Sequence, residues 1–147
     1  MQQAVSARAP AHLWIVGVLS LLWSSFGAYD YTMSNMRSAA YLGKMGDPAV
    51  ILAWMDSMPL YAKIGWALGV WAAVLGSVLL LLRSRYALYA FALSIVGMVL
   101  SFGGQYLGPP EPYQATGVLK YIPAIVVLIG LAQTWYAWRE TKDGVLR

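Results

Sequence analysis

The chain has 147 residues, of which 60% are hydrophobic and 11% are charged, with a formal net charge of +4. A soluble domain is about a quarter charged, so this chain lacks the charge to cover a water-facing surface, and lipid is its predicted solvent. The sequence has no cysteine and one histidine, His12, which excludes disulfides, thiolate metal sites and multi-histidine metal centres, so we expect no metal and no cofactor.

Four apolar stretches are each long enough to form a helix that crosses a hydrocarbon core of roughly 30 Å. Charged residues or prolines delimit them, and the expected spans are about 11–31, 62–82, 86–107 and 119–139. The predicted fold is therefore all-α: a single transmembrane domain over 1–147, built as a membrane four-helix bundle.

An alternative for the first stretch is a cleaved signal peptide, because the apolar run from Leu13 to Leu22 has the length of one. The apolar character continues through Trp23 and Phe26, and aromatic residues then flank Asp30, as in a membrane-interface belt. These features favour a retained transmembrane helix.

The connection between the first two spans is expected to be partly helical. Residues 31–42 contain no glycine or proline, so the first helix is predicted to continue to about Leu42 and to end at Gly43. Asp47 and Pro48 then form an N-cap followed by proline at the first helical position. They predict a short helix over about 48–58, which is too apolar for water and too short to cross, and is expected to lie at the outer membrane surface as an interfacial or re-entrant helix.

The loop between the third and fourth spans, residues 108–118, is rich in proline and is expected to be extended. Pro123 lies in the first turn of the fourth span, where its missing N–H is no loss, so we expect it to start the helix without a kink.

Lysine and arginine counts predict the orientation, because cytoplasmic loops carry an excess of both. Six lie on the side of the two termini and of the turn between the second and third spans, and four lie on the other side. The short basic turn Arg83-Ser84-Arg85 resists translocation. We therefore expect both the N-terminus and the C-terminus to be cytoplasmic, and both long loops to face the periplasm.

Three of the expected spans carry small residues at spacings of three and four, which in lipid allow close helix contacts. The first has Gly17, Ser20, Ser24 and Gly27; the second has Gly65, Gly69, Ala72, Ala73 and Gly76; the third has Ala90, Ser94, Gly97, Ser101 and Gly104. Packing within the chain is the favoured interpretation, with homodimerisation and a ligand groove as the alternatives.

Motifs for catalysis are absent from the sequence: there is no phosphate-binding glycine loop, no GxSxG and no HExxH. No enzyme is therefore predicted. Because the positive charges lie at helix ends and not along a basic stripe, we expect no nucleic-acid partner. His12, at the inner end of the first span, is interpreted as a solvated interface residue.

Polar residues gather at the outer ends of the four spans and form the one candidate site. Its members are Asp30, Arg37, Lys63, Gln105, Tyr106 and Lys120. One interpretation is a periplasm-facing pocket with an acid, bases and aromatic walls, and the other, which is favoured, is an interface belt with one helix-linking salt bridge. We expect Asp30 to pair with Lys63, Lys120 or Arg37, because an unpaired carboxylate at this depth is poorly solvated.

Several stretches resemble a family of small four-span proteobacterial membrane proteins, and the likeness covers most of the chain. They are residues 26–33 (FGAYDYTM), 66–71 (WALGVW), 76–83 (GSVLLLLR) and 144–147 (GVLR). The resemblance implies a multi-pass protein of the bacterial inner membrane. Members often carry the automated label "sugar transporter", which implies no particular binding residues.

The leading functional hypothesis is a non-enzymatic integral membrane protein that binds a partner protein, a lipid or itself. No ionisable side chain is expected near mid-membrane, and pumps and proton relays usually need one. The alternative is a small oligomeric transporter or channel for an uncharged or amphipathic solute. It requires oligomerisation, because four helices lined with small residues leave little room for a pore.

Overall fold

The computed structural model describes residues 9–44, 46–107 and 121–147, and all structural statements below concern these residues. Their regular structure is helical throughout, as predicted. The six helices are α1 (Ala11–Asn35), α2 (Ala39–Leu42), α3 (Pro48–Ser57), α4 (Leu60–Leu81), α5 (Tyr86–Leu107) and α6 (Ile122–Lys142).

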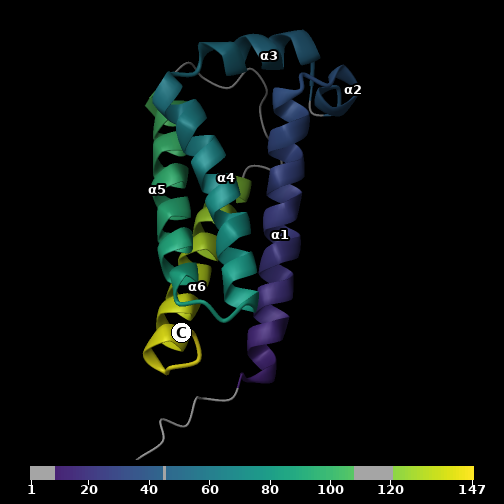
Figure 1. The fold of residues 1–147 in the computed structure, drawn as a ribbon. Coiled ribbons are helices and arrows are strands. Elements are labelled where there is room, and N and C mark those ends of the chain that lie inside the picture. The colour runs from purple at the N-terminus through teal and green to yellow at the C-terminus, as the bar shows by residue number, and fades with distance from the viewer. Residues whose placement is uncertain (1–8, 45, 108–120) are drawn as a thin grey trace, which may run out of the picture.

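The four long helices α1, α4, α5 and α6 run alongside one another as a bundle, and α3 lies across one end (Figure 1). Helix α1 packs on α4, α4 packs on α5, and α5 packs on α6. We call the end that carries α2 and α3 the α3 end. The opposite end carries the turn 83–85, the start of α1 and residue 147, and we call it the 83–85 end.

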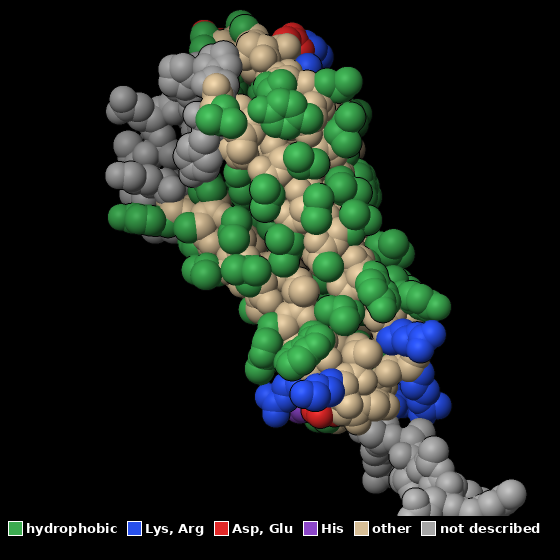
Figure 2. Space-filling model, turned by 90° about the vertical axis from the view of Figure 1, so that its left-hand side faces the viewer, with side chains coloured by type: hydrophobic (Ala, Val, Ile, Leu, Met, Phe, Trp, Pro, Cys, Tyr) green, Lys and Arg blue, Asp and Glu red, His purple; other side chains and the backbone are tan. Residues whose placement is uncertain are grey.

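Side chains are distributed inside out relative to a soluble protein. In α1 the buried positions include Gly17, Ser20 and Ser24, whereas the large Phe26 is 66% exposed. Figure 2 shows a broad band of hydrophobic side chains between two charged ends. An exposed hydrophobic band of this size is unfavourable in water, whereas the hydrocarbon chains of lipid solvate it.

Three of the described helices are long and apolar enough to cross a membrane: Ala11–Asn35, Leu60–Leu81 and the Tyr86–Gly104 part of α5. Together with the exposed hydrophobic band, they make this a multi-pass membrane protein. Helix α6 also has 21 residues, but Gln133, Arg139 and Glu140 lower its hydropathy, and it is not among the three.

Close backbone contact joins α4 to α5. A Cβ atom added at Gly97 would lie 2.6 Å from the carbonyl oxygen of Gly65 and 2.8 Å from Cα of Gly69. The Ser94 hydroxyl donates a hydrogen bond of 2.6 Å to the Gly69 carbonyl oxygen. The small residues predicted on these two helices are therefore buried where the helices meet, which is the packing interpretation. Gly27 of α1 differs, since nothing lies within 4 Å of its added Cβ.

Helix α1 ends earlier than predicted. It stops at Asn35, and Arg37 then has φ 57°, in the left-handed region, so the chain turns before α2 begins. Ser38 caps α2 by accepting a hydrogen bond from the Tyr41 N–H, and α2 ends at Gly43. The expected continuous helix to Leu42 is therefore wrong, because a turn at 36–38 breaks it.

The predicted start of α3 is confirmed. The Asp47 carboxylate accepts a hydrogen bond of 3.0 Å from the Ala49 N–H, and Pro48 is the first helical residue. Proline likewise lies in the first turn of α6. The loop 108–118 lies outside the described residues.

At the 83–85 end the last residues fold back onto the bundle. Gly144, with φ 76°, ends α6 and turns the chain. The Arg85 N–H donates to the Arg147 carbonyl oxygen at 2.9 Å, and the Arg147 N–H donates to the Arg83 carbonyl oxygen at 2.8 Å. Residues 145 and 146 are buried in one apolar cluster that includes Leu13, Leu80, Ala87, Phe91 and Ala137.

Candidate binding site at the α3 end

A pocket of about 140 Å³ lies between the end of α1, the end of α3 and the start of α4. Three helices contribute residues to its wall, and α3, which supplies some of them, lies across this end of the bundle (Figure 1). The lining residues are Tyr31, Ser34, Asn35, Arg37, Met55, Asp56, Met58, Lys63 and Trp66. Two members of the predicted cluster, Arg37 and Lys63, are among them.

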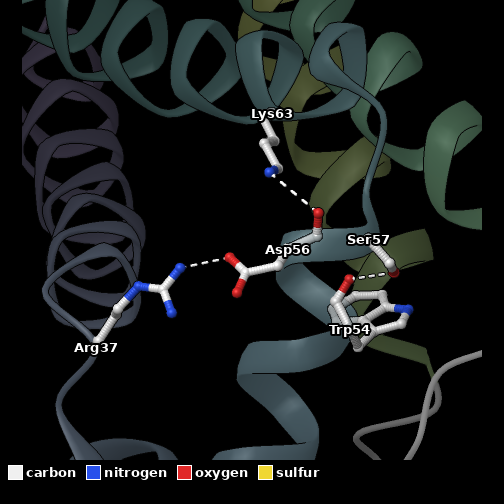
Figure 3. A network of polar contacts seen from close by, with 5 residues as sticks. All are labelled: Arg37, Trp54, Asp56, Ser57 and Lys63. Atoms are coloured by element: carbon white, nitrogen blue, oxygen red, sulfur yellow. Dashed lines mark hydrogen bonds and ion pairs between the residues drawn. The ribbon is translucent and has the colours of Figure 1, made fainter.

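Charged groups meet at Asp56. Figure 3 shows Arg37 and Lys63 reaching toward Asp56 from two sides of the pocket. The Arg37 guanidinium forms an ion pair with the Asp56 carboxylate, and the two side chains are 56% and 54% exposed. The Lys63 ammonium donates a long hydrogen bond, 3.5 Å, to the Asp56 carbonyl oxygen. These contacts connect α3 to the end of α1 and to the start of α4.

Aromatic rings form another part of the wall. Tyr31 and Trp66 meet edge to face, with ring centroids 5.0 Å apart, and Trp71 approaches Tyr31 at 6.1 Å. Such edge-to-face pairs add about 0.5–1.5 kcal/mol beyond the area they bury. They hold α1 and α4 together directly beside the charged groups.

Asp30 has a different partner from those predicted. The Tyr41 hydroxyl of α2 donates a hydrogen bond to the Asp30 carboxylate. Neither Arg37 nor Lys63 forms an ion pair with Asp30 in the described part of the chain, because Arg37 is engaged by Asp56. The predicted pairing with these two cations is therefore wrong. The turn at 36–38, which directs α2 back toward α1, is the reason.

Tyr41 is outside the expected spans, and its environment resists ionisation. Burial and the hydrogen bond to Asp30 both raise the pKa of Tyr41, and the negative charge of Asp30 adds to the effect. The pair therefore holds a neutral phenol against a carboxylate at neutral pH. It is a structural contact between α1 and α2 and does not line the pocket.

The other three residues of the predicted cluster are not placed. The side chains of Gln105 and Tyr106 and the whole of Lys120 lie outside the described residues.

A second polar group, on α6, was missed from the sequence. Gln133 is 7% exposed, and its amide nitrogen has no hydrogen-bond partner in the part of the chain that the structure describes. Glu140 is also buried, and the Tyr136 hydroxyl bonds to Nδ1 of His12 at 2.5 Å. The sequence signal for this group was a spacing of three and four residues along one face of α6. The buried residues on that face are Gly130, Gln133, Ala137 and Glu140.

No group of histidine, cysteine or acidic side chains within 9–44, 46–107 and 121–147 is arranged to hold a metal ion. Comparison with known proteins found no matching family model, no similar curated protein and no similar solved structure. The functional argument therefore depends on the geometry of the chain itself.

Proposed function

We propose that this chain is a four-span inner-membrane protein that binds a membrane component without transforming it, and that the pocket at the α3 end is its recognition site. The observation that carries the proposal is a contrast in side-chain chemistry. Charged and aromatic side chains from three helices converge on the pocket, whereas the α4–α5 contact below it is filled by glycine and serine. Binding needs charged and aromatic side chains such as those of the pocket. The glycine and serine residues of the α4–α5 contact pack so closely that they leave no space for a reaction centre.

The fourth span in this proposal is α6. It packs along α5, and an added Cβ at Gly130 would lie 3.0 Å from the terminal methyl of Met98, so the two helices are close. Large apolar side chains cover its outer face: Ile122, Ile125, Leu128, Leu131, Trp135 and Trp138. An apolar outer face beside three membrane-capable helices is energetically suited only to lipid.

Orientation is proposed from the basic residues at the 83–85 end, where Arg83, Arg85, Arg139 and Lys142 cluster at helix ends. Cysteine labelling tests it, since the chain has no native cysteine. With a membrane-impermeant thiol reagent on spheroplasts, Lys44→Cys should react, and Ser84→Cys should react only after lysis. Labelling of Ser84→Cys in intact spheroplasts would reverse the orientation.

Among the three partner classes expected from the sequence, a lipid fits the pocket best. A volume of about 140 Å³ admits a headgroup and not a protein element. Its lining combines charged groups with tyrosine and tryptophan, which are typical of the membrane interface.

Native mass spectrometry from mild detergent tests the binding function. Ser34 lines the pocket and is 3% exposed, so Ser34→Leu should fill the pocket. Ser25→Leu is the matched control, because Ser25 is an exposed serine on the same helix. The parent and Ser25→Leu should retain an adduct of lipid mass that Ser34→Leu loses. Equal adducts on all three, or none on any, would contradict the proposal, provided that circular dichroism shows equal helix content.

The buried, unpartnered amide of Gln133 favours the alternative of an oligomeric transporter or channel for an uncharged solute. A polar group inside a transmembrane bundle commonly marks a solute path. Solute entry into proteoliposomes that is lost in Gln133→Leu, and kept in the lipid-facing control Leu131→Ala, would support transport.

A further inference from the structure

The pocket at the α3 end carries an excess of positive charge. Arg37 and Asp56 neutralise one another through their ion pair. Lys63 has no carboxylate within 4.0 Å among the described residues, and its one hydrogen bond there is the 3.5 Å contact with a carbonyl oxygen. One ammonium group is therefore left without a counter-charge in a wall built from three helices.

The backbone at Arg37 is held in an unfavourable conformation. Its φ of 57° lies in the left-handed region, which is unfavourable for a non-glycine residue. This turn brings the guanidinium across to α3, where one of its terminal nitrogens, Nη2, bonds to Asp56. A guanidinium has five N–H donors, so this group retains donors for a further acceptor.

Ser34 adds a hydroxyl to the same wall. It lines the pocket and is 3% exposed, so its hydroxyl lies close to a ligand in the pocket. The pocket thus combines ammonium, guanidinium and hydroxyl donors with one apolar aromatic side, formed by Tyr31 and Trp66. An anion with several acceptor oxygens and an apolar substituent complements this set.

We infer that the pocket binds the phosphate of an anionic phospholipid headgroup, with Lys63 and Arg37 as the binding cations and the Tyr31–Trp66 pair beside the start of the acyl chains. The inference rests on the proposed binding function and names its ligand. A lipid phosphate is preferred over a free one because the aromatic side has no role in binding an inorganic ion. The pocket also lies at the end of the apolar band that faces lipid.

Lipid titration of the delipidated protein in detergent tests the inference. The probes are dioleoyl phosphatidylglycerol and dioleoylglycerol, which has the same chains and no phosphate, with binding measured by native mass spectrometry. The parent should bind the phosphatidylglycerol at least about tenfold more tightly than the dioleoylglycerol, since a charge-assisted hydrogen bond contributes about 1.5–3 kcal/mol. Lys63→Gln should remove most of this preference, and Lys63→Arg should keep it.

Lys44→Gln is the matched control, because it removes one positive charge from the same end outside the pocket lining. It should change the preference less than about twofold, because an exposed charge at a distance is screened. Arg37→Asn is a second pocket variant, since asparagine tolerates the left-handed conformation. It should weaken phospholipid binding without loss of helix content.

Three results would overturn the inference. One is equal affinity of the parent for both lipids, which leaves lipid binding itself intact. Another is unchanged preference in Lys63→Gln. The third is displacement of the phospholipid by inorganic phosphate at equal concentration, which would assign the site to the free ion. If neither lipid binds to the parent, the proposed binding function is contradicted as well.

Discussion

The two ends of the bundle are constructed in opposite ways. At the 83–85 end, side chains from α1, α4, α5, α6 and the last residues share one apolar cluster, and backbone hydrogen bonds join residues 83–85 to residue 147. At the α3 end, a half-exposed ion pair and one long hydrogen bond connect α3 to the end of α1 and the start of α4, and Ile51 and Met58 are buried there. The 83–85 end is therefore expected to contribute more to the stability of the bundle, whereas the α3 end carries the proposed binding site. The following variants test this difference.

The largest effect is expected at the α4–α5 contact, which connects the two ends. Gly97→Leu should destabilise the protein in detergent by about 3 kcal/mol or more, because overpacking a tight contact forces the backbones apart. Thermal unfolding followed by circular dichroism measures it. Gly103→Leu, on the same helix with no described residue within 4 Å of an added Cβ, is the control and should be nearly neutral. Similar melting of the two variants would show that the α4–α5 contact does not limit stability.

A smaller loss is expected from the apolar cluster at the 83–85 end. Leu146→Ala removes a buried side chain from that cluster and should cost about 2 kcal/mol or more. Leu82→Ala is the same substitution at the same end on an exposed residue, and should cost far less. Equal losses in the two variants would show that residues 145 and 146 do not pack as described.

Loss of the Tyr41 hydroxyl should have an effect of about 1 kcal/mol that depends on pH. Because the folded pKa of Tyr41 is raised above its ordinary value, its contribution is complete below about pH 10 and is lost as the pH rises toward the folded pKa. The stability difference between the parent and Tyr41→Phe should therefore be constant from pH 7 to 9 and should shrink above pH 10. A difference that grows above pH 10 would contradict the hydrogen bond to Asp30.

The smallest effect on stability is expected at the α3 end. Asp56→Asn breaks an ion pair between half-exposed side chains, and such pairs contribute less than about 1 kcal/mol. Local opening should nevertheless change, since this pair connects α3 to the end of α1. Backbone amides of 51–57 should exchange hydrogen faster in Asp56→Asn, while those of 94–101 in α5 remain unchanged. Faster exchange in both 51–57 and 94–101 would mean that the two ends of the bundle do not open independently.

Local signals in the sequence were sufficient for most of the fold. The spacing of Ser94 and Gly97 predicted a close helix contact because small residues at intervals of three and four have few other uses in lipid. Asp47 and Pro48 predicted the start of α3 because capping depends on adjacent residues alone. Both features are decided within a few residues of the chain.

Contacts between distant residues could not be predicted in the same way. The end of α1 depends on Arg37 in a left-handed conformation, which no glycine or asparagine indicated. The contacts of Asp30 with Tyr41 and of Arg37 with Asp56 follow from that turn, and neither was predicted, whereas the predicted pairing of Asp30 with Lys120 lies outside the described residues. The Arg37–Asp56 pair joins residues 19 positions apart on separate elements. In α6, the residues of the buried stripe through Gln133 recur at helical spacing in the sequence. Its polar members were not recognised as buried, because polar residues are also typical of the membrane interface.

The turn at 83–85 has a consequence for how the protein is made. It joins α4 and α5 so closely that we expect the two helices to pair once both have left the ribosome, because Gly65, Gly69 and Gly97 lie where the two helices meet. Helix α1 packs closely on this hairpin, since an added Cβ at Gly17 would lie 2.9 Å from Cγ of Leu81. Assembly is therefore expected to centre on this hairpin, with α1 packing on α4 and α6 packing on α5.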